Sequence, residues 1–159
     1  MGRAIVAVIS LVVVAGAALA VDVRTNLGTL TCSTMPAARQ AERSSADTAV
    51  LQCVFKAAGS ANEERYSGAI SELGAGKSFD TKHVLVWTVM GPATAQLEPG
   101  LLAQRYVSGT PGGASNATAP RVLVGQRAAD IMLQQETSGP GGEDTAVTVL
   151  DLKLSLTPA

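Results

Sequence analysis

The sequence predicts a mainly β domain, an antiparallel sandwich or small barrel of about eight strands that follows an N-terminal signal helix. Two observations lead to this prediction. Short apolar segments recur along the chain with turn-forming residues between them, and few stretches show the three-to-four spacing of an amphipathic helix. The chain has 159 residues, which suits a single domain. We therefore expect a signal peptide over residues 1–20 and one β-rich domain over residues 21–159.

The chain opens with an apolar leader. Arg3 precedes the stretch from Ala4 to Ala20, in which 15 of 17 residues are Ala, Val, Ile or Leu, and the stretch ends in Ala18-Leu19-Ala20. A positive start, an apolar middle and a small-x-small end are typical of a secretory signal peptide, so we expect cleavage after Ala20. A retained anchor is the alternative, although a spanning helix needs about 20 apolar residues. The mature protein is expected in the periplasm or outside the cell, with no integral membrane anchor after cleavage.

The first three predicted strands each place apolar residues at every second position, as a strand with one buried face does. Segment 27–32 has Leu30 and Cys32 on one face and two threonines on the other. Segment 51–55 alternates in the same way around Gln52, and segment 66–70 does so through Tyr66 and Ile70. Residues 36–47 lack a sustained apolar stripe, so they predict a solvated loop or a short helix, the least regular insertion of the domain.

The later segments differ in strength. Segment 83–90 has apolar residues on both faces, which is typical of a central strand. Segments 101–107, 121–125 and 130–135 are shorter candidates. The clearest is 150–156, where four leucines alternate with Asp151, Lys153 and Ser155. Eight strands at this spacing, with Gly- and Pro-rich turns between them, favour a sandwich or barrel.

The two cysteines, Cys32 and Cys53, form an even pair. In an oxidising compartment such a pair normally forms a disulfide, and a loop of this size contributes about 3 kcal/mol of stability. The alternative is two buried thiols that pack as small apolar side chains.

The composition excludes several classes of function. A net charge of −1 gives no electrostatic footprint for nucleic acid. The single histidine, His83, and the absence of spaced acidic clusters leave no metal site, and no cofactor is expected. Gly74-Ala-Gly-Lys-Ser78 is similar to the end of a phosphate-binding loop, but Ser71 stands where the first glycine is required, so we interpret it as a hairpin loop. Asn116-Ala-Thr118 fits the N-glycosylation acceptor pattern.

Three hypotheses for function remain. The first is a non-catalytic structural or binding module of the cell envelope, because no catalytic set can be assigned. The second is a barrel that holds a lipid or other small apolar ligand, and its expected lining is Trp87, Val89 and Tyr106. The third is a carboxylate-dependent glycan hydrolase, and its candidate carboxylates are Glu64, Glu72, Glu98 and Glu136. The expected partner is accordingly an envelope component or a small apolar molecule, and not a nucleic acid.

Several phrases along the chain are similar to those of one family. They are Leu27-Gly-Thr-Leu-Thr-Cys32, Leu51-Gln-Cys-Val-Phe55, Glu64-Arg-Tyr-Ser-Gly68, Val84-Leu-Val-Trp87, Gly91-Pro92, Tyr106 and Val122-Leu-Val-Gly125. Together they resemble domain-of-unknown-function family 992, short exported proteins of Gram-negative and mostly alphaproteobacterial origin. The resemblance implies a leader followed by a β-rich domain, supports pairing of the two cysteines, and carries over no functional residue. The chain diverges in its C-terminal third, at residues 119–121, 125–126 and 133–137.

Overall fold

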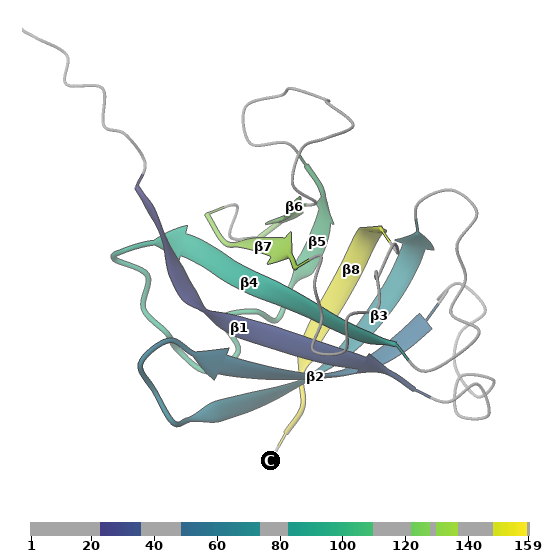
Figure 1. Cartoon of the computed structure of the whole chain (residues 1–159), viewed down its shortest axis with the longest axis horizontal. Helices are drawn as coiled ribbons and strands as arrows, with labels where there is room; N and C mark the ends of the chain where they lie inside the picture. Colours follow the sequence, from purple (N-terminus) through teal and green to yellow (C-terminus); the bar gives the residue numbers. More distant parts are fainter. Residues whose placement is uncertain are drawn as a thin grey trace, which may run out of the picture.

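The computed structural model describes residues 23–35, 49–73, 83–109, 122–127, 130–136 and 148–158. These residues form eight strands and no helix (Figure 1). The strands are β1 (Arg24–Thr34), β2 (Ala49–Ala57), β3 (Glu63–Leu73), β4 (Val84–Pro92), β5 (Arg105–Ser108), β6 (Val122–Gly125), β7 (Met132–Gln135) and β8 (Val149–Leu156). The described part of the chain has no helix long and apolar enough to cross a membrane. The predicted signal helix, the cleavage point after Ala20, the insertion 36–47, the loop Gly74–Ser78 and the acceptor at Asn116 lie outside the described residues.

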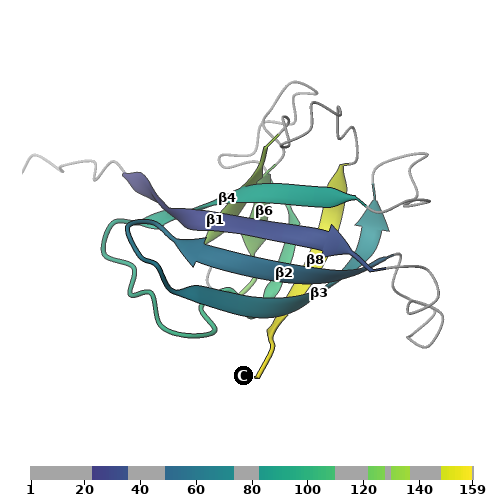
Figure 2. The same cartoon turned by 60° about the horizontal axis from the view of Figure 1, so that its bottom comes forward.

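The strands close into one antiparallel barrel in the order β1-β2-β3-β8-β5-β6-β7-β4. Strands β1, β2 and β3 follow one another as a meander along one wall (Figure 2). Strand β8 lies between β3 and β5, and β4 completes the ring by pairing with both β1 and β7. The predicted class of fold is confirmed, and of the two predicted architectures the chain adopts the barrel.

One end of the barrel, which we call the terminal rim, holds both ends of the folded chain. Because every neighbouring pair of strands is antiparallel, β1 begins and β8 ends at this rim. The connections 58–62, 93–104 and 126–131 join strands at the same rim. The longest of them, 93–104, reaches across toward the barrel interior and supplies a core residue, Leu102.

The predicted strand 101–107 is shorter in the structure, where β5 starts only at Arg105. Turns occupy the residues before it: the N–H of Leu101 donates to the carbonyl of Glu98, and the N–H of Ala103 donates to that of Gly100. Gly100 has a φ of +83°, a left-handed conformation that ends an extended run. The two leucines that suggested a strand therefore lie in a turn, where Leu102 is fully buried in the core and the half-buried Leu101 packs against it.

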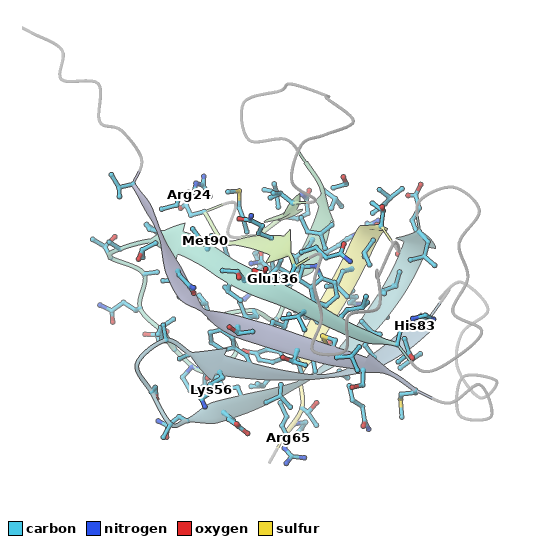
Figure 3. The ribbon with its side chains drawn as sticks, viewed as in Figure 1. Arg24, Lys56, Arg65, His83, Met90 and Glu136 are labelled. Atoms are coloured by element: carbon cyan, nitrogen blue, oxygen red, sulfur yellow. A yellow bond between two sulfur atoms is a disulfide. The ribbon has the colours of Figure 1, made fainter. Side chains whose placement is uncertain are left out.

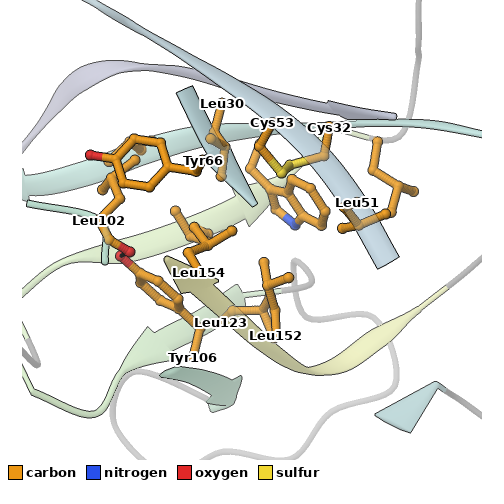
Figure 4. Close-up of a cluster of buried hydrophobic side chains, with 14 of the residues drawn as sticks. Leu30, Cys32, Leu51, Cys53, Tyr66, Leu102, Tyr106, Leu123, Leu152 and Leu154 are labelled. Carbon is orange, nitrogen blue, oxygen red and sulfur yellow. Dashed lines mark hydrogen bonds between the residues drawn. A yellow bond between two sulfur atoms is a disulfide. The ribbon is translucent and has the colours of Figure 1, made fainter. Parts of the chain in front are cut away.

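The barrel interior is filled by side chains, as expected for eight strands. Inward positions alternate along each strand, and Tyr66, Trp87 and Tyr106 are the largest fully buried side chains. In Figure 4 the rings of Tyr66 and Tyr106 extend toward Leu102 near the terminal rim. The buried cluster comprises Leu27, Leu30, Cys32, Ala49, Leu51, Cys53, Phe55, Tyr66, Ile70, Leu85, Trp87, Val89, Leu102, Tyr106, Leu123, Ile131, Leu133, Val149, Leu152 and Leu154.

The predicted disulfide joins Cys32 and Cys53 across β1 and β2 (Figure 4). The two cysteines are direct partners in the strand register, and both are buried in the barrel interior. Gly68 on β3 makes room for the bond, because a Cβ there would lie 3.1 Å from Leu51 Cβ and 3.4 Å from the Sγ of Cys53. The bond therefore forms part of the packed core and is shielded from solvent.

Candidate functional site

Two basic side chains face each other on the outer wall of the barrel. Tyr106 on β5 and Leu152 on β8 are buried inside, so their neighbours Arg105 and Lys153 project outward. The register of β5 and β8 pairs Arg105 directly with Lys153. Like charges directly opposite each other destabilise a sheet. The pair is therefore a candidate for binding, and Asp151 supplies a counter-charge for only one of the two cations.

A buried carboxylate orients one of these cations. The Nε of Arg105 donates to both carboxylate oxygens of Asp151, at 3.1 and 3.0 Å, and its Nη2 contacts the same group. Asp151 is only 6% exposed, although it belongs to the outer face of β8. The hydrogen bonds from Arg105 hold the pKa of Asp151 below its ordinary value, against the effect of burial, and Ser71 adds a further hydrogen bond. Asp151 thus stays ionised and holds Arg105 against β8.

A third cation, Arg127, is placed by a buried amide. Gln104 donates from Nε2 to the hydroxyl of Tyr106 at 3.2 Å, and its Oε1 accepts a hydrogen bond from the N–H of Arg127 at 2.9 Å. The carbonyl of Gln104 accepts from the N–H of Leu154, also at 2.9 Å. One residue therefore ties the β6–β7 connection, the barrel interior and β8 together.

Two neighbouring grooves open around these residues. The first, which we call the cationic groove, has a volume of about 500 Å³ and is lined by residues 103–105, 126–127 and 153–156. The second, the loop groove, has a volume of about 410 Å³ and is lined by Gln96, residues 98–101, Gln104 and Arg127. Gln104 and Arg127 line both grooves. Each volume is within the range of small-molecule sites, about 300–1,000 Å³.

The charges of the cationic groove leave a local excess. Three basic residues, Arg105, Arg127 and Lys153, line it, and the Asp151 carboxylate compensates Arg105. Within the described residues no carboxylate forms an ion pair with Arg127 or Lys153. Two positive charges are therefore left over in a chain whose net charge is −1.

A family model described as "Protein of unknown function (DUF992)" matches residues 11–155. The chain belongs to this family. The match spans most of the chain, including all eight strands except the last residue of β8. No curated protein and no solved structure matches the sequence. Membership of the DUF992 family therefore assigns no activity, and a function can be inferred only from the arrangement of the residues.

The four candidate carboxylates of the DUF992 chain lie at different levels of the barrel. Glu64 and Glu98 are at the terminal rim, and Glu72 is near the far end of β3. Glu136 follows β7 and lies over the middle of β4, where its N–H donates to the carbonyl of Val86 (Figure 3). Glu136 accepts a hydrogen bond from Thr88 Oγ1 at 2.5 Å. The structure thus keeps Glu72 and Glu136 apart from the other carboxylates and brings only Glu64 and Glu98 to the connection 93–104.

Glu64 has a structural use at the terminal rim. Its Oε2 accepts from the hydroxyl of Tyr66 at 2.5 Å and from the N–H of Gly100 at 3.4 Å, which fastens the connection 93–104 to β3. Burial and the contact with Glu64 raise the pKa of Tyr66, and burial raises that of Tyr106. Both tyrosines remain neutral hydrogen-bonding groups, so this cluster serves to close the barrel.

The proposed interior lining of the DUF992 barrel, Trp87, Val89 and Tyr106, is fully buried in the core. None of the three lines the cationic groove or the loop groove. Trp87 Nε1 is buried without a hydrogen-bond partner in the described structure. Binding of an apolar ligand by these residues stays a prediction.

His83 lies at the start of β4, far along the strand from the terminal rim (Figure 3). Its N–H donates to Thr34 Oγ1 at 2.8 Å, and the N–H of Thr34 donates to the His83 carbonyl at 2.9 Å. His83 therefore helps to join β1 to β4. Among the described residues, no three His, Cys, Asp or Glu side chains gather as a metal site requires.

No pattern in the sequence predicted a site at Gln104, Arg105, Arg127 or Lys153. Lys153 carried a usable signal, since it occupies an outward position in the clearest alternating segment. Its partner Arg105 lies 48 residues earlier in the chain, and only the strand order β8-β5 brings the two together. That order is not readable from local patterns.

Proposed function

We propose that this protein is exported to the periplasm or the cell exterior and is a non-catalytic envelope protein that binds an anionic ligand in the cationic groove. The main support for this proposal is that Arg105 on β5 and Lys153 on β8 are direct partners in the strand register. Arg127 lines the same groove. Like charges directly opposite each other destabilise a sheet, and here Asp151 offsets the charge of Arg105 but not that of Lys153. A bound anion would offset the charges of Lys153 and Arg127, which no described carboxylate pairs with.

Two features support export. The leader has the layout of a signal peptide, with Arg3 before the apolar stretch from Ala4 to Ala20. The disulfide between Cys32 and Cys53 suits an oxidising compartment, because such bonds are rare in the reducing cytosol. The expected mature protein begins at Val21 and keeps the disulfide.

The export proposal is tested by expressing the full chain in a Gram-negative host and measuring the intact mass of protein from the periplasm. We expect a mass that corresponds to a chain starting at Val21, with two hydrogens fewer than the reduced form. An alkylating reagent added to the native protein should leave both cysteines unmodified. A chain that retains Met1, or one that takes up two alkyl groups, contradicts the proposal.

Anion binding is tested by nuclear magnetic resonance titration of the mature protein with galacturonate and with inorganic phosphate at low ionic strength. We expect saturable shifts at the backbone amides of residues 103–105, 126–127 and 153–156, which weaken as salt screens the charges. Lys153→Gln combined with Arg127→Gln should abolish them. Shifts spread evenly over the surface, or unchanged in the double variant, contradict the assignment.

Lys56→Gln is the matched control for this titration. Lys56 is an exposed lysine on the outer face of β2, where Figure 3 places it beside β3, and it lines neither groove. It removes the same kind of charge from another part of the barrel. An effect equal to that of Lys153→Gln would mean that overall charge, and not the groove, governs binding.

A second function is favoured by one observation inside the barrel. Trp87 Nε1 is a buried donor without a partner, and leaving such a group unsatisfied costs about 1–3 kcal/mol. A small apolar ligand with one acceptor atom would satisfy it, if the core side chains packed around Trp87 move apart to admit the ligand. Titration with decanoate, followed through the emission of Trp87, separates the two functions. A saturable change that survives the double variant Arg127→Gln and Lys153→Gln supports the interior site, and an unchanged emission overturns it.

A further inference from the structure

The cationic groove and the loop groove adjoin, because Gln104 and Arg127 line both. A ligand that fills one groove therefore reaches the border of the other. The buried Gln104 amide fixes the main chain of Arg127 at this border through the 2.9 Å hydrogen bond to its N–H. The two grooves have the layout of two successive subsites for one elongated ligand.

The two subsites differ in charge. The cationic groove has the excess of basic groups, from Lys153, Arg127 and the partly compensated Arg105. The loop groove offers the amide of Gln96, the carboxylate of Glu98 and Arg127. The buried Gln104 amide, in contrast, is already hydrogen-bonded to Tyr106 and to the main chain of Arg127. Glu98 is exposed and would repel a second anionic group. The pair of grooves therefore suits a ligand with an acidic unit next to a neutral, hydroxyl-bearing unit.

The described aromatic residues contribute no stacking surface. Phe55, Tyr66, Trp87 and Tyr106 are all buried in the core. Single-stranded nucleic acids are bound largely by stacking of bases on exposed aromatic side chains, and such platforms are missing from the described wall. The Gln126 amide, the Ser155 hydroxyl and the basic groups instead match the hydroxyls and carboxylates of sugars, and the exposed Leu156 matches their C–H faces.

We propose that the two grooves together bind an acidic polysaccharide in which carboxylate-bearing and neutral sugars alternate. The acidic sugar occupies the cationic groove and the neutral sugar occupies the loop groove. This inference rests on the proposed anion-binding function and deepens it by naming the class of ligand. Glu98 is the residue that determines specificity, because it disfavours a polymer with a carboxylate on every unit.

The test is calorimetric titration of the mature protein with four defined probes. They are glucuronate, a hyaluronan tetrasaccharide with alternating acidic and neutral sugars, a tetragalacturonate with four carboxylates, and a neutral glucose tetramer. We expect the alternating tetrasaccharide to bind about tenfold more tightly than glucuronate, because the second subsite adds binding within one molecule. The neutral tetramer should bind least.

Two variants separate the charges of the subsites. Lys153→Gln should weaken binding of all three acidic probes, whereas Lys56→Gln should change none of them. Glu98→Gln should strengthen binding of tetragalacturonate by about threefold, the size of one exposed charge interaction, and should leave the alternating tetrasaccharide unchanged. A selective effect of Glu98→Gln on tetragalacturonate would show that the loop groove distinguishes an acidic from a neutral sugar. A general effect of net charge would instead strengthen binding of both tetrasaccharides.

Several outcomes overturn the inference. Equal affinity for glucuronate and the alternating tetrasaccharide would leave a site for a single anion, in which case the proposed function stands and the polysaccharide does not. If a single-stranded oligonucleotide of similar charge bound with equal affinity, the grooves would bind polyanions in general and would not be specific for acidic sugars. If the protein is folded, as the emission of a buried Trp87 would show, and yet binds none of the acidic probes, the proposed anion-binding function is contradicted as well.

Discussion

Asp151 is the residue on which the charged outer wall of β5 and β8 depends. Its carboxylate is buried and accepts from the guanidinium of Arg105, which is itself largely exposed. We predict that Asp151→Asn lowers the free energy of unfolding at pH 7 by about 1–3 kcal/mol, the range for buried hydrogen bonds to charged groups. Urea denaturation, followed by the emission of Trp87, measures this change.

The effect of Asp151→Asn depends on pH. The pKa of Asp151 is lowered in the folded barrel, so its stabilising contribution is present above the unfolded value near 4 and is lost as pH falls through the lower folded value. The wild type and the variant should therefore converge in stability once the pH falls below the lowered pKa that Asp151 has in the folded barrel. Asp130→Asn is the control, because Asp130 is exposed and meets Arg24 through its main-chain oxygen. A difference that persists undiminished at low pH would contradict the assignment.

Gly28 is a residue that only glycine can fill. Its φ of +150° lies where side chains are strained, and a Cβ there would be 2.3 Å from the carbonyl oxygen of Lys56 and 2.7 Å from the ring of Phe55. We predict that Gly28→Ala destabilises the barrel by at least about 2 kcal/mol, through strain and overpacking. Gly59→Ala provides the comparison, since Gly59 has a φ of +72° but open space, and should cost only about 1 kcal/mol in thermal unfolding. If the two substitutions lower stability equally, the close contacts of a Cβ at position 28 with Lys56 and Phe55 must be relieved without loss of stability.

At the scale of elements, the connection 93–104 acts as the plug of the terminal rim. Leu102 in this connection is fully buried and its carbonyl accepts from the hydroxyl of Tyr106 at 3.3 Å. We predict that Leu102→Ala costs about 2–5 kcal/mol of stability, the range for a buried leucine. Leu97→Ala in the same connection should change stability by less than about 0.5 kcal/mol, because Leu97 is 44% exposed. Chemical denaturation of both variants measures the contrast, and similar values would show that the connection does not plug the barrel.

The elements differ in how far the sequence reveals them. Strand β8 was predicted over 150–156 and spans Val149–Leu156, because a clean alternation reports directly which side chains face the core. The start of the strand predicted over 101–107 was wrong, because two adjacent leucines occur in turns as well as in strands. The one local indication of a turn is Gly100, which has a positive φ. Local pattern therefore predicts the existence of strands better than their starts.

The candidate site was beyond prediction for a different reason. Arg105, Arg127 and Lys153 come from three elements that no local pattern connects, and their proximity depends on the ring order in which β8 enters between β3 and β5. The predicted site residues instead lie in the core or at separate ends of the barrel. Gln104 gave no signal, because a single glutamine before a short strand is most simply a surface residue, whereas here it is buried and bonded on three sides.

At the scale of the whole molecule, both tyrosines of the chain are buried in the barrel and have raised pKa values. Their contribution to stability is fully present below the unfolded value near 10 and falls as pH rises above it. We predict that tyrosinate absorbance does not follow an ordinary titration near pH 10, but rises together with the loss of buried Trp87 emission as the barrel unfolds. Absorbance that rises near pH 10 while the emission stays constant would mean that a tyrosine ionises in the folded protein.

The position of β8 in the ring has a consequence for the timing of folding. The last strand of the chain pairs with β3 and β5, and the first strand pairs with β2 and β4, so the wall has a gap until the final residues arrive. Pairings such as Tyr66 with Leu156 span most of the domain, and contacts that distant in sequence form slowly. A chain that lacks β8 therefore cannot close the ring between β3 and β5. Under the proposed export, the barrel would close only after β8 has crossed the membrane, where the cysteines of β1 and β2 meet an oxidant.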